Sequence, residues 1–134
     1  MSIMGRKVPI RALVVIVSCL VLGTLIPVLS RSEPREIRLV ARDMAFYLED
    51  DPRAPNPTIT VAPGEAVRIV LRNADQGLQH DFAVPVTKAS TKALRFGDQD
   101  TLVLKAPTAP GTYEYVCQPH RPMMRGEIRV VADP

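Results

Sequence analysis

From residue 32 onward, short apolar segments are separated every few residues by proline or glycine, and this rhythm is what most limits the fold. Residues 67–72 and 127–130 alternate apolar and polar side chains, which is the period of a strand with one face on a core. Ala-Pro-Gly sequences at 62–64 and 109–111 are turn signatures, because proline sets φ and glycine accepts positive φ. No stretch of ten residues in this region has helical periodicity. Strands are predicted at 37–41, 58–61, 67–73, 81–84, 101–105, 112–116 and 127–131.

Residues 32–134 are therefore predicted to form one all-β domain, a barrel or sandwich of about eight strands. A domain of this size buries roughly 60–65% of the surface of its unfolded chain and can fold alone. Residues 49–57 contain three prolines and are predicted to be an exposed, stiff loop.

Residues 1–31 have a different composition, because 12–29 form an 18-residue run without any charge. A helix of that length spans roughly 27 Å, close to the ~30 Å of the hydrocarbon layer. We predict a retained signal anchor, one N-terminal transmembrane helix, since the run is long for a signal peptide and no clean cleavage site follows it. A cleaved signal peptide is the alternative, and a faint lipobox before Cys19 leaves a lipid anchor as another.

The basic charge of the chain does not predict nucleic-acid binding. All of the formal net charge of +3 belongs to Arg6, Lys7 and Arg11, whereas from Arg31 onward 14 Lys/Arg balance 14 Asp/Glu. The domain therefore has a formal charge of zero and no basic patch interleaved with aromatic residues. Lys/Arg counts are equal on the two sides of the apolar run, so charge does not decide its orientation.

Cys117 is the only cysteine of the domain and cannot form a disulfide within it. It lies on a proline-bounded loop between two predicted strands, with His120 three residues later and Met123 and Met124 next. Thiolate, imidazole and thioether suit copper, which takes a trigonal His₂Cys set with a weak axial Met. The second histidine that such a site needs can only be His80, the one other histidine in the chain.

Taken singly, each of these residues has a simpler explanation. A lone buried Cys is usually a small hydrophobic residue, a lone His a hydrogen-bonded turn residue, and a Met a packing residue. Together, however, two histidines and one thiol are the number that a mononuclear site requires. Zinc fits less well, because it rarely takes a thioether as its fourth ligand.

The motif Gly-x-Tyr-x-Tyr-x-Cys-x-Pro-His at 111–120, followed by Met-x-Gly at 124–126, resembles the ligand loop of the cupredoxins plastocyanin and amicyanin. The His-x-Phe sequence at His80 is similar to the first copper histidine of that family. The resemblance implies an eight-stranded Greek-key barrel that binds one copper ion. The implied ligands are His80, Cys117 and His120 around the metal and Met124 on its axis, with Met123 as the alternative axial residue.

Two residues depart from the family pattern. Asp81 follows the first histidine where Asn is frequent; it can accept hydrogen bonds between the ligand loops but cannot donate an amide N–H. Gln118 follows the cysteine where Ser or Thr is frequent. Hydrogen bonding around the thiolate is therefore expected to differ from that of the family.

The predicted function is that of a membrane-tethered one-electron carrier whose domain lies on the non-cytoplasmic side, periplasmic or extracellular. Redox protein partners are expected at the apolar surface around His120, which Pro119, Pro122 and Met123 surround, and the membrane at 12–29. One alternative is a copper carrier or resistance protein that stores or hands over the metal without electron relay. Another is an interaction module without metal.

Catalysis is not expected, and neither is a small-molecule substrate. Multicopper oxidases and copper nitrite reductases need more histidines, and a binuclear copper site needs two cysteines in the ligand loop. No glycine-rich phosphate loop and no Gly-x-Ser-x-Gly motif occurs in the chain.

Overall fold

The computed structural model describes residues 32–132 of the chain. The predicted membrane segment at 12–29, and with it the 1–31 anchor, lies outside the described residues. Among residues 32–132, no helix combines the length and the apolar character needed to cross a membrane.

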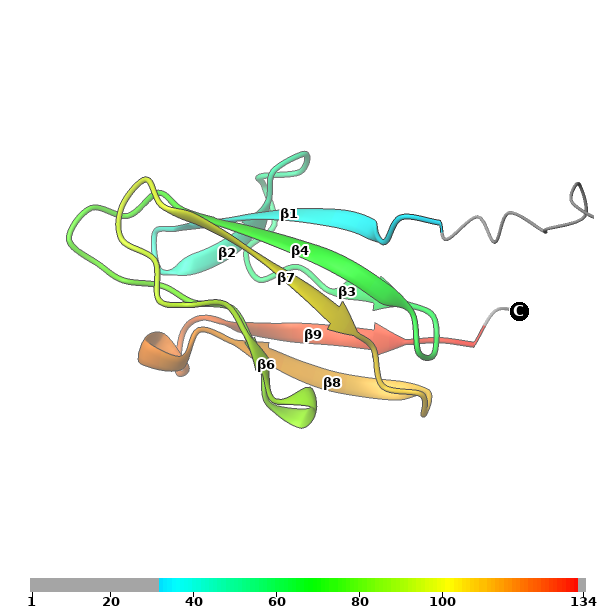
Figure 1. Ribbon diagram of the computed structural model, residues 1–134. Coiled ribbons are helices and arrows are strands. Elements are labelled where there is room, and N and C mark those ends of the chain that lie inside the picture. The colour runs from blue at the N-terminus through cyan, green and yellow to red at the C-terminus, as the bar shows by residue number, and fades with distance from the viewer. Residues whose placement is uncertain (1–31, 133–134) are drawn as a thin grey trace, which may run out of the picture. The chain divides into compact units, whose positions relative to one another are not determined.

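The described residues form two β-sheets that face each other in a sandwich (Figure 1). The first sheet has the strand order β2-β1-β4-β7, and the second has the order β3-β9-β8-β5-β6. The strands are β1 (Arg35–Arg42), β2 (Ala45–Leu48), β3 (Ile59–Val61), β4 (Ala66–Asn73), β5 (Ala83–Val84), β6 (Ala89–Ser90), β7 (Gln99–Lys105), β8 (Gly111–Val116) and β9 (Arg125–Val130). Two 3₁₀ turns, η1 (Pro85–Thr87) and η2 (Gln118–His120), are the only helical elements in 32–132.

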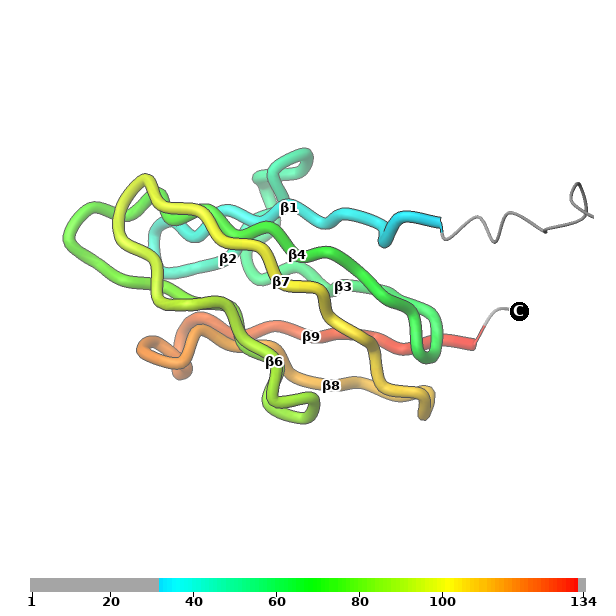
Figure 2. The backbone as a smooth tube through the Cα atoms, viewed as in Figure 1, coloured from blue at the N-terminus to red at the C-terminus, as the bar shows by residue number. Residues whose placement is uncertain are grey.

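The pairing of the strands gives the sandwich two distinct ends. β1 pairs in parallel with β4, β3 pairs in parallel with β9, and the other pairs are antiparallel. The start of β1 and the end of β9 lie at one end, and η2 lies at the other (Figure 2). The loop that carries the cysteine is therefore far from the point where the N-terminal residues join the domain.

Three aromatic rings pack against one another in the core. Phe46, Phe82 and Tyr115 are fully buried, with ring centroids 5.0–5.8 Å apart. Alternate residues of an extended chain share a face, so Phe82 anchors the segment of His80, and Tyr115 anchors that of Cys117. Edge and stacked contacts of this kind contribute about 0.5–1.5 kcal/mol per pair beyond burial.

Within residues 32–132 all seven predicted strands are present, and the all-β class is confirmed there, with nine strands rather than about eight. β2 was not predicted, because Asp43 and Met44 make its turn at positive φ (51° and 58°) without a glycine to signal it. β6 was missed as well, since only two residues pair there. The strand predicted at 81–84 is shorter, and His80 instead makes an isolated bridge to Leu94.

Candidate metal centre

The loop between β8 and β9 brings Cys117 and His120 together. β8 and β9 are in register up to Val116 and Arg125, so residues 117–124 close a hairpin. Within it, the His120 amide donates to the Cys117 carbonyl at 3.1 Å, and the Cys117 amide donates to the Met124 carbonyl at 2.9 Å. Pro119 suits the first turn of η2, because its fixed φ is helical and it has no amide hydrogen to leave unpaired. The 3₁₀ turn folds His120 back over the cysteine.

Three predicted ligands converge at this end of the sandwich. Sγ of Cys117 lies 3.6 Å from Nδ1 of His80 and 3.6 Å from Nδ1 of His120. One ligand atom from each of the three residues falls within 4.8 Å of the other two. The imidazole rings are 4.9 Å apart between centroids. Two segments distant in the sequence, the one at His80 and the loop at 117–120, thus place one sulfur and two nitrogens around one point.

The two methionines of the loop differ in burial. Met124 is fully buried in the same core cluster as Cys117, whereas 57% of Met123 is exposed. Met124 is therefore the one whose thioether belongs to the interior behind the cysteine.

Asp81 ties the two ligand loops together, as an acceptor. Its Oδ1 accepts a hydrogen bond from the Gln118 amide at 2.7 Å, and Asp81 itself is buried. The next residue is fixed as well, because the Phe82 amide donates to the Thr91 hydroxyl at 3.0 Å. The segment after His80 is thus attached to the segment after Cys117 by a charge-assisted bond.

Asp75, which the sequence did not single out, lies behind His80. Its Oδ2 is 2.9 Å from Nε2 of His80, on the side of the ring opposite Cys117. Burial raises the pKa of Asp75, but hydrogen bonds from the Asp43 amide, from His80 and from the Met44 amide outweigh it, so the pKa lies below the ordinary value. No motif marks an acid five residues before a histidine, and only the fold brings the two together.

The thiol of Cys117 is in its neutral form in the metal-free protein. Burial, with a smaller contribution from the nearby Asp81 carboxylate, raises its pKa to about 11. A metal that binds the thiolate must therefore displace a proton from this sulfur.

The family follows from a match to the whole domain. Residues 15–130 match the family model of the cupredoxin-like domain. The chain belongs to this family. The resemblance found in the ligand-loop sequence is thereby confirmed.

Solved structures with the same fold include several copper proteins. Reduced auracyanin from Roseiflexus castenholzii is 20% identical, with 75% of this chain and 99% of that chain covered and a TM-score of 0.59. Auracyanin A from Chloroflexus aurantiacus, described as a "blue" copper protein, is 20% identical over 74% and 100%, with a TM-score of 0.59. Rusticyanin from Thiobacillus ferrooxidans is 21% identical over 75% and 79%, with a TM-score of 0.58. These likenesses establish the shared fold, and no curated protein matches the chain by sequence.

The donor set of this cupredoxin fits one copper ion. Two neutral imidazoles and one thiolate are the trigonal set that copper takes, and a buried thioether behind them is the usual weak fourth donor. The domain supplies these residues at one point, with Met124 in the adjoining core.

Residues from the loop between β2 and β3 hold the ligand loop of the cupredoxin in place. Asn56 donates from Nδ2 to the Met123 carbonyl at 3.2 Å, and its Oδ1 accepts from the Phe46 amide at 3.1 Å. The buried Tyr115 hydroxyl donates to the Pro57 carbonyl at 2.7 Å, and burial raises its pKa. The loop at 49–57 is exposed as predicted, but its last residues are an anchor that sequence reasoning missed.

Gly126 explains part of the Met-x-Gly sequence. It lies opposite Tyr115 in the β8–β9 pair, and a Cβ at this position would overlap the tyrosine ring. The absence of a side chain lets the ring cover the backbone at the exit of the ligand loop.

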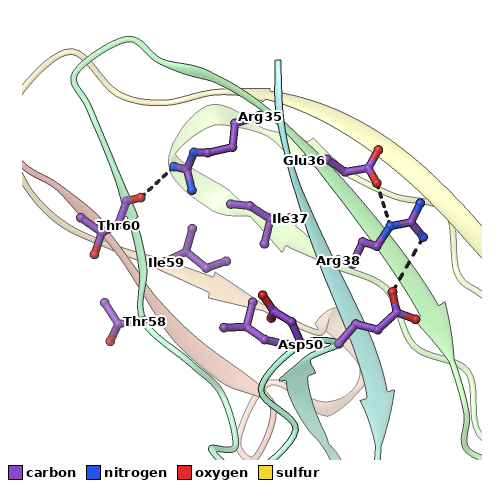
Figure 3. A pocket seen from close by; sticks show the side chains of 10 residues that line it. Arg35, Glu36, Ile37, Arg38, Asp50, Thr58, Ile59 and Thr60 are labelled. Carbon is purple, nitrogen blue, oxygen red and sulfur yellow. Dashed lines mark hydrogen bonds and ion pairs between the residues drawn. The ribbon is translucent and has the colours of Figure 1, made fainter. Parts of the chain in front are cut away.

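A groove of 710 Å³ lies between β1 and β3, and none of its lining residues belongs to the metal site. Figure 3 shows that both arginines that line it are engaged with neighbouring groups of the groove. Arg35 donates to the Thr60 carbonyl at 2.9 Å, and Arg38 pairs with Glu36 at 2.7 Å. Because these cations already have partners, the groove shows no group reserved for a ligand.

Proposed function

We propose that this chain is a type 1 copper protein that carries single electrons between redox proteins. His80, Cys117 and His120 are the equatorial ligands, and Met124 is the axial one. The observation that carries the proposal is the position of Sγ of Cys117, 3.6 Å from a nitrogen of each histidine. When bound, copper supplies the one-electron couple.

The protein supplies a ligand set that is held in place on its buried side. The His80 amide donates to Leu94 at 3.1 Å, and its carbonyl accepts from Leu94 at 2.8 Å, so the backbone of this ligand is fixed in a β-bridge. Asp81 fixes the cysteine loop against it at 2.7 Å. Ligands that move little when the metal changes between Cu(II) and Cu(I) favour fast electron transfer over catalysis or metal release.

The partner surface is proposed to be the exposed part of the ligand loop. His120 is half-buried, and Pro119, Pro122 and Met123 around it are exposed. A small apolar surface at a ligand edge suits the brief, weak contact of redox partners.

The run at 12–29 is proposed to tether the domain to a membrane, with the domain on the non-cytoplasmic side. β1 begins at the end of the sandwich opposite η2 (Figure 1), so the chain enters the domain away from the ligand loop. Tethering raises the effective concentration of the domain near membrane-bound donors and acceptors.

The test is an absorption spectrum of the protein loaded with one equivalent of Cu(II), then reduced and reoxidised. We expect an intense visible thiolate-to-copper band that bleaches and returns. Binding without the band, or a tightly held Cu(I) that does not reoxidise, would point instead to a copper carrier, for which the exposed Met123 beside His120 would be an entry ligand. Absence of binding would contradict both functions.

A further inference from the structure

The buried histidine of the site has a carboxylate on its far side. His80 is fully buried, with Nδ1 facing Sγ of Cys117 at 3.6 Å and Nε2 facing Oδ2 of Asp75 at 2.9 Å. The Asp75 side chain is only 15% exposed. One imidazole therefore connects the sulfur of the site to a nearly buried acid.

Asp75 is itself held by the turn between β1 and β2. The Asp43 amide donates to its Oδ1 at 2.8 Å, and the Met44 amide approaches its Oδ2 at 3.4 Å. Both turn residues have positive φ, 51° and 58°, which aims successive amides at one anion, as in other backbone anion sites. The Asp75 amide donates to Oδ1 of Asn73 at 2.8 Å, so its backbone is fixed too.

From this geometry we propose that Asp75 is a positioning residue of the copper centre. An ionised carboxylate only accepts hydrogen bonds, so Nε2 of His80 must carry the hydrogen, and the lone pair of Nδ1 is left facing the metal position. Asp75 thus fixes the tautomer and the ring orientation of His80 before any metal binds.

Asp75 also sets the preference of the site between the two copper charges. A hydrogen bond to a carboxylate makes the imidazole a more basic ligand, and the negative charge stabilises Cu(II) more than Cu(I). This step rests on the proposed copper function, whereas the tautomer of the metal-free protein does not.

The experiment compares the full-length protein in detergent with Asp75→Asn and with Asp43→Asn. The Asp43 side chain is 74% exposed, and its replacement removes the same charge beside the site while keeping the backbone amide that bonds Asp75. In the metal-free wild type, ¹⁵N-resolved NMR of the histidine rings should show His80 as the Nε2–H tautomer. Asp75→Asn should lower Cu(II) affinity about 10- to 100-fold. The factor by which Cu(I) affinity falls should be about tenfold smaller than the factor for Cu(II). This difference raises the reduction potential by about 59 mV.

Three results would overturn the proposal: an Nδ1–H tautomer of His80, equal losses of Cu(I) and Cu(II) affinity in Asp75→Asn, or the same potential shift in Asp43→Asn. If Asp75→Asn does not fold, the wild-type tautomer decides. A wild type that binds no copper while His80 is the Nε2–H tautomer would contradict the function but support the positioning of the ring.

Discussion

The two histidines of the site are held in opposite ways. His80 is buried, its backbone bridges Leu94, and its second nitrogen meets Asp75. His120 is half-buried on a 3₁₀ turn, and within residues 32–132 its ring makes one hydrogen-bond contact, to Cys117. The same residue type is thus built into the core on one side of the sulfur and placed at the surface on the other.

This difference separates two tasks. The buried side fixes the ligand geometry. Asp75 and Leu94 bond to His80 there, and Gln118 bonds to the neighbouring Asp81. The exposed side gives access, since His120 is half-buried and Pro119, Pro122 and Met123 around it are exposed. A one-electron carrier needs both: a rigid centre, and one ligand edge close enough to a partner for electron transfer.

Replacement of the sulfur that both histidines share should have the largest effect. In Cys117→Ala we expect the visible charge-transfer band to be absent at any copper concentration, because no thiolate remains to donate charge. Absorption and bound-copper content measure this. Cys19→Ser, which changes the other cysteine of the chain, should keep the band. A band of wild-type intensity in Cys117→Ala would place the metal elsewhere.

The two histidines should respond differently to truncation and added imidazole. In His120→Gly, free imidazole can enter from solvent and should restore most of the band. In His80→Gly the gap lies in a fully buried position beside Asp75, so imidazole should restore little. Titration of both variants with imidazole, followed by absorption, gives the comparison directly. Equal rescue of the two variants would mean that free imidazole reaches the position of His80 as easily as that of His120.

The strands and the three donors could be predicted from the sequence, because both signals are local. Alternation identifies a strand within six residues, and the count of thiols and imidazoles left one choice of ligand set. Asp75 and Asn56 could not be predicted, since each reaches the site from a loop whose position depends on the packing of two sheets. β2 was hidden for another reason: the turn before it uses non-glycine residues at positive φ.

The buried thiol makes the metal-free protein sensitive to alkali. The pKa of Cys117 is raised to about 11 in the folded state, above that of an unfolded thiol, so the unfolded chain loses its proton first. The stabilisation is complete below about pH 8.5 and is lost as pH rises through about 11, with a total of up to about 3 kcal/mol. Urea unfolding at a series of pH values measures it. In Cys117→Ala, the free energy of unfolding should no longer fall between about pH 8.5 and about pH 10. Above about pH 10 the buried Tyr115 also contributes to the pH dependence, so the comparison is made below it.

The two methionines extend the contrast between buried and exposed sides. Met124→Leu should raise the reduction potential, because a weak donor to Cu(II) is replaced by an apolar group of similar size. Met123→Leu is the matched control at a position 57% exposed, and its potential should stay at the wild-type value. Spectroelectrochemical titration of both variants tests this. A larger shift for Met123→Leu would identify Met123, rather than Met124, as the axial ligand.

The smallest effect is expected from salt. The domain has equal numbers of acidic and basic residues from Arg31 onward, and at the ligand loop Arg121 pairs with Glu114 at 2.6 Å. With little field to steer a partner, the bimolecular electron-transfer rate should change less than about threefold between ~50 and ~500 mM salt. Glu114→Gln leaves Arg121 without this pair, so its rate should become measurably more salt-dependent. A steep fall for the wild type, tenfold or more, would mean that charges rather than the apolar edge at His120 bring the partner to the exposed side.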